Sequence, residues 1–148
     1  MTLLEVYTNI LSTDKDRIID EVFSSLSKEI IELNQNQLSY GLNAEGKKFR
    51  RYKNAAYSNK KARMNSRPGI GIPDLKVKGN FWEDFKTDIR SGVIDIYSTN
   101  FVAEFLEDGT SKMQAFDNIY GLTPESMEVL RDDFLTLFND KLKAEIGL

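Results

Sequence analysis

The side chains that could do chemistry in this chain are mostly charged, and two of the most versatile catalytic types are absent. The sequence holds 20 lysines and arginines and 23 aspartates and glutamates, but no histidine and no cysteine. Their absence excludes disulfide bonds, zinc sites built from cysteine or histidine, thiol nucleophiles and histidine general bases. Catalysis by carboxylates, lysine, tyrosine or serine remains open.

Three short patterns could bind a ligand, and each has a simpler structural interpretation. Gly69-Ile70-Gly71 lacks the further glycine, the lysine and the following helix of a phosphate-binding loop, so it predicts a turn. Phe81 and Trp82 could form a ligand platform, although such aromatics more often belong to a core. Acidic residues close in sequence could hold Mg²⁺, but they are more often a solvated face; they are Glu104, Glu107, Asp108, Asp132 and Asp133. We therefore expect no catalytic residue, no metal ligand and no cofactor.

The strongest feature is a basic segment between Gly46 and Pro73. The rest of the chain carries eleven basic and 23 acidic residues, whereas this segment contains no aspartate or glutamate. Segregated charge of this kind favours contact with a polyanion or with a partner of the opposite pattern. A solvated loop that aids solubility is the simpler alternative. The nine basic residues are Lys47, Lys48, Arg50, Arg51, Lys53, Lys60, Lys61, Arg63 and Arg67.

Aromatic residues are interleaved with these charges. Phe49, Tyr52 and Tyr57 could anchor the segment against the protein or stack on nucleic-acid bases. No helix-turn-helix, RNA-recognition or zinc-finger pattern accompanies them, so sequence-specific recognition is not indicated. Residues 41–73 are polar and aperiodic, and they predict a long, partly ordered loop excursion. Because its charges repel one another, we expect this excursion to become ordered only against negative charge from a neighbouring subunit or from DNA.

Two long amphipathic helices are predicted to position this excursion. Apolar residues recur at three- and four-residue spacing from Ile18 to Leu33, which predicts a helix of roughly 20 residues that the polar run at 34–36 and Gly41 end. Thr123-Pro124-Glu125 provides an N-cap, a proline at the first helical position and an acid in the first turn. It predicts a second long helix that extends through Ile146. Residues 3–11 could form a short helix or a strand-like lead-in.

The region between the helices predicts a small sheet. Ser91-Gly92 separates two β-like runs, 85–90 and 93–97, as in a hairpin. Leu75, Val77 and residues 101–106 also fall in this sheet region, whereas Phe81-Trp82 resembles one helical turn. The fold class is α+β: long N- and C-terminal helices packed on a small curved antiparallel sheet, in a single domain over residues 1–148. The predicted core comprises Ile19, Val22, Leu26, Ile30, Phe85, Ile89, Ile94, Ile96, Leu130, Phe134 and Leu137.

The sequence carries no membrane or secretion signal that we recognise. No apolar run approaches the roughly 20 residues of a membrane span. The N-terminus lacks the basic and apolar regions of a secretory signal. We therefore expect the chain to be made and kept in a cytoplasm.

Five short motifs follow one another between Ile18 and Leu142. After the N-terminal helix come Gly46-Lys47-Lys48-Phe49, Tyr52, Tyr57 and Lys60, and then Leu75, Gly79, Phe81 and Phe85 before the hairpin around Gly92. Residues 102–110 (VAEFLEDGT) and the step Tyr120-Gly121-Leu122 precede the closing helix. In this order the motifs resemble the small head–tail joining proteins of long-tailed bacteriophages, also called neck or tail-completion proteins. These are related to the virion morphogenesis proteins of transposable phages.

This resemblance implies a fold and a role. The fold would be α+β with helices on one side of a curved sheet, and the role would be assembly into a ring at the portal–tail junction, through which genomic DNA passes. The implied partners are further copies of the chain, a portal-side adaptor and tail tube or terminator proteins, with transient contact to DNA and none with a membrane. The implied location is the virion neck. Val102 and Asp117-Asn118-Ile119 depart from the pattern, which usually has a tyrosine and a proline-rich segment there.

Two classes of function therefore compete. A structural ring subunit needs two different complementary surfaces, which the basic segment and the acidic remainder could supply. A small sequence-nonspecific nucleic-acid-binding protein would instead use residues 46–67 as a phosphate clamp. A carboxylate-based hydrolase or nuclease is a weaker third hypothesis, because no carboxylate pair lies in a convincing motif.

Overall fold

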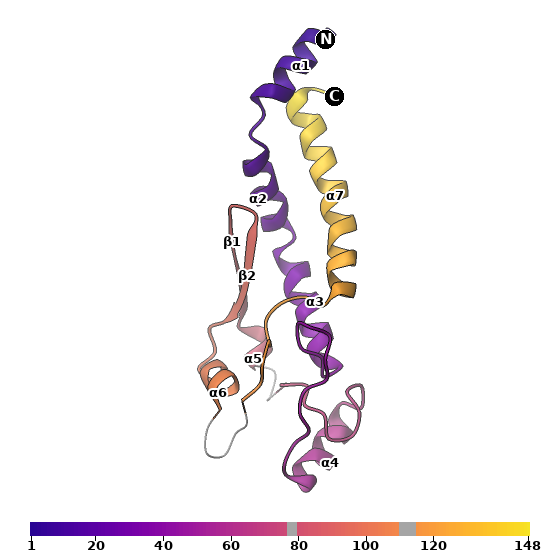
Figure 1. Ribbon diagram of the computed structural model, residues 1–148, viewed down its shortest axis with the longest axis vertical. Helices are drawn as coiled ribbons and strands as arrows, with labels where there is room; N and C mark the ends of the chain where they lie inside the picture. The colour runs from indigo at the N-terminus through magenta and orange to yellow at the C-terminus, as the bar shows by residue number, and fades with distance from the viewer. Residues whose placement is uncertain (77–79, 110–114) are drawn as a thin grey trace.

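The computed structural model describes residues 1–76, 80–109 and 115–148, and its architecture is α+β, as the sequence predicts. The molecule is elongated: α1, α2 and α3 follow one another along its length, and α7 runs back beside them (Figure 1). Both termini lie at one end and α4 lies at the other. The elements are α1 (Leu3–Ser12), α2 (Lys15–Ser25), α3 (Ser27–Ser39), α4 (Ala55–Met64), α5 (Asn80–Glu83), β1 (Phe85–Arg90), β2 (Val93–Ser98), α6 (Val102–Asp108) and α7 (Pro124–Ile146).

The long N-terminal helix predicted from Ile18 to Leu33 is divided into α2 and α3 at Leu26. Leu26 has φ −93° and ψ 3°, and its N–H donates to the carbonyl oxygens of Val22 and Phe23, both at 3.1 Å. Such shared bonding tightens the last turn of α2 and redirects the chain. The polar run at 34–36 does not end the helix, because α3 continues to Ser39, and Gly41 follows its C-cap as predicted.

Asn34 of the predicted polar run and Gln37 just after it have buried side chains that form hydrogen bonds. The Asn34 side-chain amide donates to the carbonyl oxygens of Ile119 and Gly121 at 3.1 and 3.0 Å. The Gln37 side chain donates to the Gly121 carbonyl at 2.6 Å and accepts from the N–H of Thr123 at 3.0 Å. Buried amides are tolerated when they are bonded. These two fasten α3 to the segment that leads into α7.

Gly41 is the residue at which the chain leaves α3. Its φ of +71° lies in the left-handed region that favours glycine. A Cβ atom there would lie 2.5 Å from Ile72 Cγ2 and 2.9 Å from both Pro68 Cβ and the Pro73 carbonyl oxygen. The end of the basic segment therefore packs against the point at which the chain leaves α3.

The predicted hairpin is confirmed. β1 and β2 pair antiparallel with Arg90 opposite Val93. Ser91 and Gly92 both have positive φ, 50° and 74°, as a two-residue type I′ turn requires. Asp20 of α2 accepts hydrogen bonds from the N–H groups of Ser91 and Gly92 at 3.2 and 2.8 Å. The tip of the hairpin is thereby fixed to the N-terminal helices.

The core has two parts along the long axis. One part joins α2, α3 and α7 through Ile18, Val22, Leu26, Ile30 and Leu130, with Phe134, Phe138 and Leu142 packed against them. The other joins the end of α3 to the start of the basic segment, the hairpin base and α6 through Leu38, Phe49, Leu75, Phe81, Phe85, Ala103, Leu106, Phe116 and Ile119. The basic segment therefore contributes to the second part.

Several local predictions are corrected. Leu137 is 37% exposed, because α7 turns its Leu130, Phe134 and Phe138 toward the core instead. Residues 101–106 do not belong to a sheet, since Val102–Asp108 form α6, which buries Ala103 and Leu106. Leu75 has φ +56° and lies in no strand; Val77 falls outside the described residues. Ile19, Ile89, Ile94 and Ile96 are partly buried, whereas Val22, Leu26, Ile30, Phe85 and Leu130 are buried as predicted.

Candidate functional site

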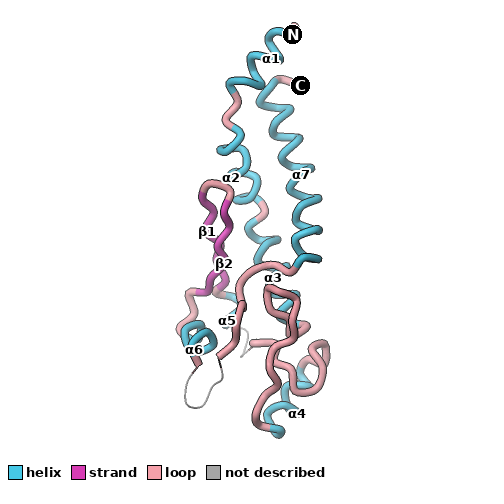
Figure 2. Tube along the Cα trace, in the orientation of Figure 1, coloured by secondary structure: helices cyan, strands magenta, loops and turns pink. Residues whose placement is uncertain are grey.

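The basic segment forms the end of the molecule opposite the termini (Figure 1), and it is not only a loop. Ala55–Met64 form α4, and loops lie on both sides of this helix (Figure 2). The Asn54 side chain caps the helix by accepting the N–H of Tyr57 at 3.0 Å. The two alanines that follow favour helix, and the basic Lys61 and Arg63 in the last turn complement its dipole.

Two of the three aromatic residues in the segment pack against the protein. Phe49 is buried, and its ring meets that of Phe116 edge to face with centroids 5.5 Å apart. Tyr52 is partly buried, and its N–H donates to the Gly71 carbonyl at 2.8 Å. Burial, more than any other cause, raises the pKa of the Tyr52 hydroxyl. The Tyr57 ring meets the Tyr52 ring edge to face, with centroids 5.0 Å apart, but Tyr57 remains exposed to solvent.

Lys61 is the one member of the predicted contact set that is buried within its own chain. Its Nζ lies 2.7 Å from Asp74 Oδ1, with the two side chains only 9% and 3% exposed. The same ammonium donates to the Lys76 carbonyl at 2.7 Å, and Asn65 donates to the other Asp74 oxygen at 3.0 Å. A buried pair with all its groups hydrogen-bonded holds a fixed geometry. Lys61 therefore fastens α4 to residues 74–76 and is not available to a partner.

Lys48 and Arg67 also find partners inside the chain. Lys48 Nζ donates to the carbonyl oxygens of Tyr40 and Pro68 at 2.6 and 2.9 Å. The Arg67 guanidinium lies over the Tyr40 ring, 5.5 Å from its centroid. These contacts hold both ends of the basic segment against the end of α3. The prediction that the segment needs outside negative charge to become ordered is therefore wrong for these positions.

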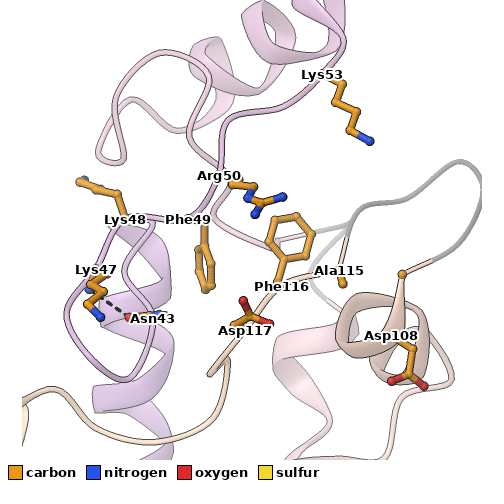
Figure 3. Close-up of a pocket in the computed structure, with 11 residues that line it drawn as sticks. Asn43, Lys47, Lys48, Phe49, Arg50, Lys53, Asp108, Ala115, Phe116 and Asp117 are labelled. Atoms are coloured by element: carbon orange, nitrogen blue, oxygen red, sulfur yellow. Dashed lines mark hydrogen bonds between the residues drawn. The ribbon is translucent and has the colours of Figure 1, made fainter.

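An open groove of about 620 Å³ lies beside the start of the segment (Figure 3). Lys47, Lys48, Arg50 and Lys53 line it together with Asp108 and Asp117, around the buried pair of phenylalanines. Lys47 also forms an ion pair of 2.5 Å with Glu45, which raises the pKa of the lysine. The groove thus has walls of both signs, which suits a protein surface better than a bare phosphate chain.

Four of the eight exposed cations of the basic segment lack a partner within the described residues. Arg51, Lys53, Lys60 and Arg63 have no ion-pair or hydrogen-bond partner among the side chains of the described residues. Lys60 and Arg63 lie on α4, and Arg51 and Lys53 lie on the loop before it. These four are the part of the predicted contact set that is free to meet a partner.

α7 carries an acidic outer strip that the sequence analysis does not single out. Glu125, Glu128 and Asp132 are spaced by three and four residues, so they lie on one side of the helix, and all three are exposed. Val129 and Leu135 are exposed beside them. The sequence could have predicted this strip, because acids at positions i, i+3 and i+7 lie on the same face of a helix.

A second acidic contact joins α3 to α7. A protonated Glu29 can share a hydrogen bond with Asp133, and this interaction, together with burial and the neighbouring charges of Asp133 and Glu32, raises the pKa of Glu29. Two carboxylates in contact repel when both are ionised. The negative charge on this side of the molecule is therefore not fully balanced within the chain.

The described residues lack two further features. They contain no group of three or more acidic, histidine or cysteine side chains that could hold a metal ion. Among the described helices, none combines the length and the apolar character needed to cross a bilayer.

Comparison with known proteins adds no relative. No family model, no curated protein and no solved structure matches the chain.

Proposed function

We propose that this protein is a structural subunit that assembles with copies of itself into a ring. We place the ring at the head–tail junction of a tailed bacteriophage, between a portal-side adaptor and tail tube or terminator proteins. The ordered motifs between Ile18 and Leu142 support this place in the virion, and the surface of the subunit supports the assembly. The proposal assigns the chain no catalytic role.

The observation that carries the proposal is the separation of unbalanced charge along an elongated subunit. Four exposed cations lie at the α4 end without partners among the described residues, while an acidic strip lies on α7. One copy cannot bring these surfaces together, since both are exposed in the same chain. Copies arranged head to tail would each supply both surfaces, and such contacts close into rings when the rotation between copies allows it.

The opposite end of the subunit offers a further contact surface. α1 has no buried residue, and its Leu3, Leu4, Tyr7 and Leu11 are each at least 60% exposed. These side chains lie on adjoining sides of the helix, and contiguous exposed apolar surface usually marks a protein contact. An elongated subunit with a charged end and an apolar end suits a position between two different neighbours.

The mass of the purified protein, measured by native mass spectrometry over a range of concentrations, tests the proposal. We expect small species alone and a closed oligomer of one stoichiometry when the portal-side partner is added. Imaging of intact particles should place the protein on the head–tail axis. A monomer under every condition, or a location away from that axis, would refute the proposal. Mg²⁺-dependent cleavage of DNA that is lost on changing one acid would contradict the absence of a catalytic role.

One observation favours nucleic-acid binding as a second candidate function. Tyr57 is exposed on α4 near Lys60 and Arg63, and an aromatic ring beside cations can stack on a base while the cations meet phosphates. Titration of duplex DNA at two salt concentrations separates the two functions. Tight binding by the isolated subunit with a steep salt dependence would favour the dedicated DNA-binding protein.

A further inference from the structure

α4 presents one exposed face in which cations and apolar side chains alternate. Lys60 and Arg63 supply the charge, and Tyr57 and Met64 supply the apolar surface, Met64 being 68% exposed. Tyr57, Lys60 and Met64 are spaced by three and four residues and so form one strip. The buried side of the helix, which adjoins this strip, carries Ser58 and Lys61. We call these four residues the α4 face.

α7 presents a face of matching design and opposite charge. Glu125, Glu128 and Asp132 supply three carboxylates, and Val129 and Leu135 lie among them, Val129 being 52% exposed. α7 directs other residues, Leu130 above all, to the core. Among the described residues only Arg131 pairs with one of these acids, at 3.9 Å from Glu128. We call these five residues the α7 face.

We propose that the α4 face of one copy docks on the α7 face of a neighbouring copy. The inference rests on the proposed function, because it names the two surfaces through which copies of the subunit meet. Each face combines exposed apolar side chains with charge, and the two charges are opposite. α4 has ten residues and the α7 face spans a similar stretch of helix, so each is about 15 Å long at 1.5 Å per residue.

A second copy of the chain would cover more of the α4 and α7 faces than a nucleic acid would. Phosphates would match Lys60 and Arg63, but they would leave Met64 and the whole α7 face without a partner. A second copy covers both faces at once with one kind of contact. Since the two faces differ, the contact is head to tail, and each copy can bind one neighbour on each side.

Cross-linking between single-cysteine variants tests this contact directly, because the natural sequence contains no cysteine. M64C and isotope-labelled V129C are mixed and treated with a short bismaleimide, and the products are weighed by mass spectrometry. Val129 lies near the middle of its face, so the result does not depend on the direction in which α4 crosses α7. We expect the mixed dimer to exceed each homodimer roughly tenfold, since a specific contact outcompetes random collision. K86C, an exposed position on the hairpin, replaces V129C as the matched control and should give no excess.

Charge reversal provides the second arm. The double variants K60E/R63E and E128K/D132K should each reduce self-association roughly tenfold, since attraction becomes repulsion. A mixture of the two variants should restore association, because each reversed face then meets a face of opposite charge. K15E/K86E removes the same charge at exposed positions elsewhere and should behave like the natural protein. Thermal melting of all variants checks that they remain folded.

Three results would overturn the inference. The M64C homodimer could be as abundant as the mixed dimer, the mixture of reversed variants could fail to restore association, or DNA could bind tightly through Lys60 and Arg63 with no cross-link formed. Closed oligomers that persist without the predicted cross-link would overturn this contact and leave the proposed function intact. A chain that stays monomeric with its portal-side partner present would overturn both.

Discussion

Removing the Lys61 ammonium should destabilise the fold far more than removing the exposed cations around it. The substitution Lys61→Met keeps most of the side-chain length and deletes the charge. In the native protein, Lys61 Nζ lies 2.7 Å from an oxygen of Asp74, whose side chain is almost completely buried. The variant leaves that carboxylate inside the protein without its counter-charge.

The expected loss in the free energy of unfolding depends on the hydrogen bonds that Asp74 keeps in the variant. Removal of one partner of a buried ion pair costs about 3–5 kcal/mol. Asp74 still accepts the N–H of Lys76 and the side-chain amide of Asn65, both at 3.0 Å, so we expect a loss of about 3 kcal/mol, at the lower end of that range. For an m value of about 2 kcal/mol per M, the urea midpoint should fall by about 1.5 M.

Urea unfolding followed by circular dichroism measures this loss, and Lys60→Met is the matched control. Lys60 is exposed on the same helix, so its substitution should change the free energy of unfolding by less than about 0.5 kcal/mol. The double variant Lys61→Met/Asp74→Asn removes the unpaired charge and should recover at least part of the loss. If Lys61→Met and Lys60→Met unfold at the same urea concentration, the pair does not hold α4 in place and the reasoning is wrong.

Three further predictions concern the rest of the fold. Leu26→Ala and Phe134→Ala should each lower the free energy of unfolding, Leu26→Ala by about 2–5 kcal/mol because its side chain is buried between α2 and α3; a loss below about 0.5 kcal/mol at both would mean that the helices bury other faces. Gly41→Ala should lower the melting temperature measurably, because its Cβ would lie 2.5 Å from Ile72 Cγ2 at a φ of +71°; an unchanged temperature would show that the segment yields there at no cost. The raised pKa of Glu29 means that the folded state holds its proton more tightly than the unfolded state, so the contribution of Glu29 to stability should rise as the pH falls from neutrality toward the ordinary value of 4.5. Glu29→Gln should reduce that rise and melt higher at neutral pH, and an unaltered pH profile would contradict the contact with Asp133.

The parts of the fold that the sequence predicts well depend on local signals. Ser91-Gly92 between two alternating runs predicts the hairpin, because the turn requires positive φ at both positions and the flanking periodicity is two. Thr123 and Pro124 predict the start of α7 in the same way, and Thr123 accepts the N–H of Ser126 at 3.2 Å. Both signals lie within a few residues of the structure that they specify.

The parts that the sequence does not predict depend on distant partners. Asparagine commonly lies at the end of a helix. Asn34 nevertheless lies inside α3, because its side-chain amide donates hydrogen bonds to the carbonyl oxygens of Ile119 and Gly121. The run without acidic residues that defines the basic segment ends at Pro73, one residue before Asp74. The charge count of the segment therefore leaves out the carboxylate that pairs with Lys61. No local rule states that residues 85 positions apart will meet.

The in-chain partners of Lys48, Lys61 and Arg67 change how the basic end can recognise a neighbour. A segment that became ordered only on binding would bind more weakly, because the entropy lost on ordering would reduce the binding free energy. Here α4 is already held by its own chain, so its exposed face is formed before a partner arrives, and more of the contact energy remains for binding. Substitutions at Lys48 would therefore mix a folding effect with a binding effect. Lys60 and Arg63 carry charge without such in-chain contacts among the described residues, so changes there act on recognition, apart from the contribution of Arg63 to the helix dipole.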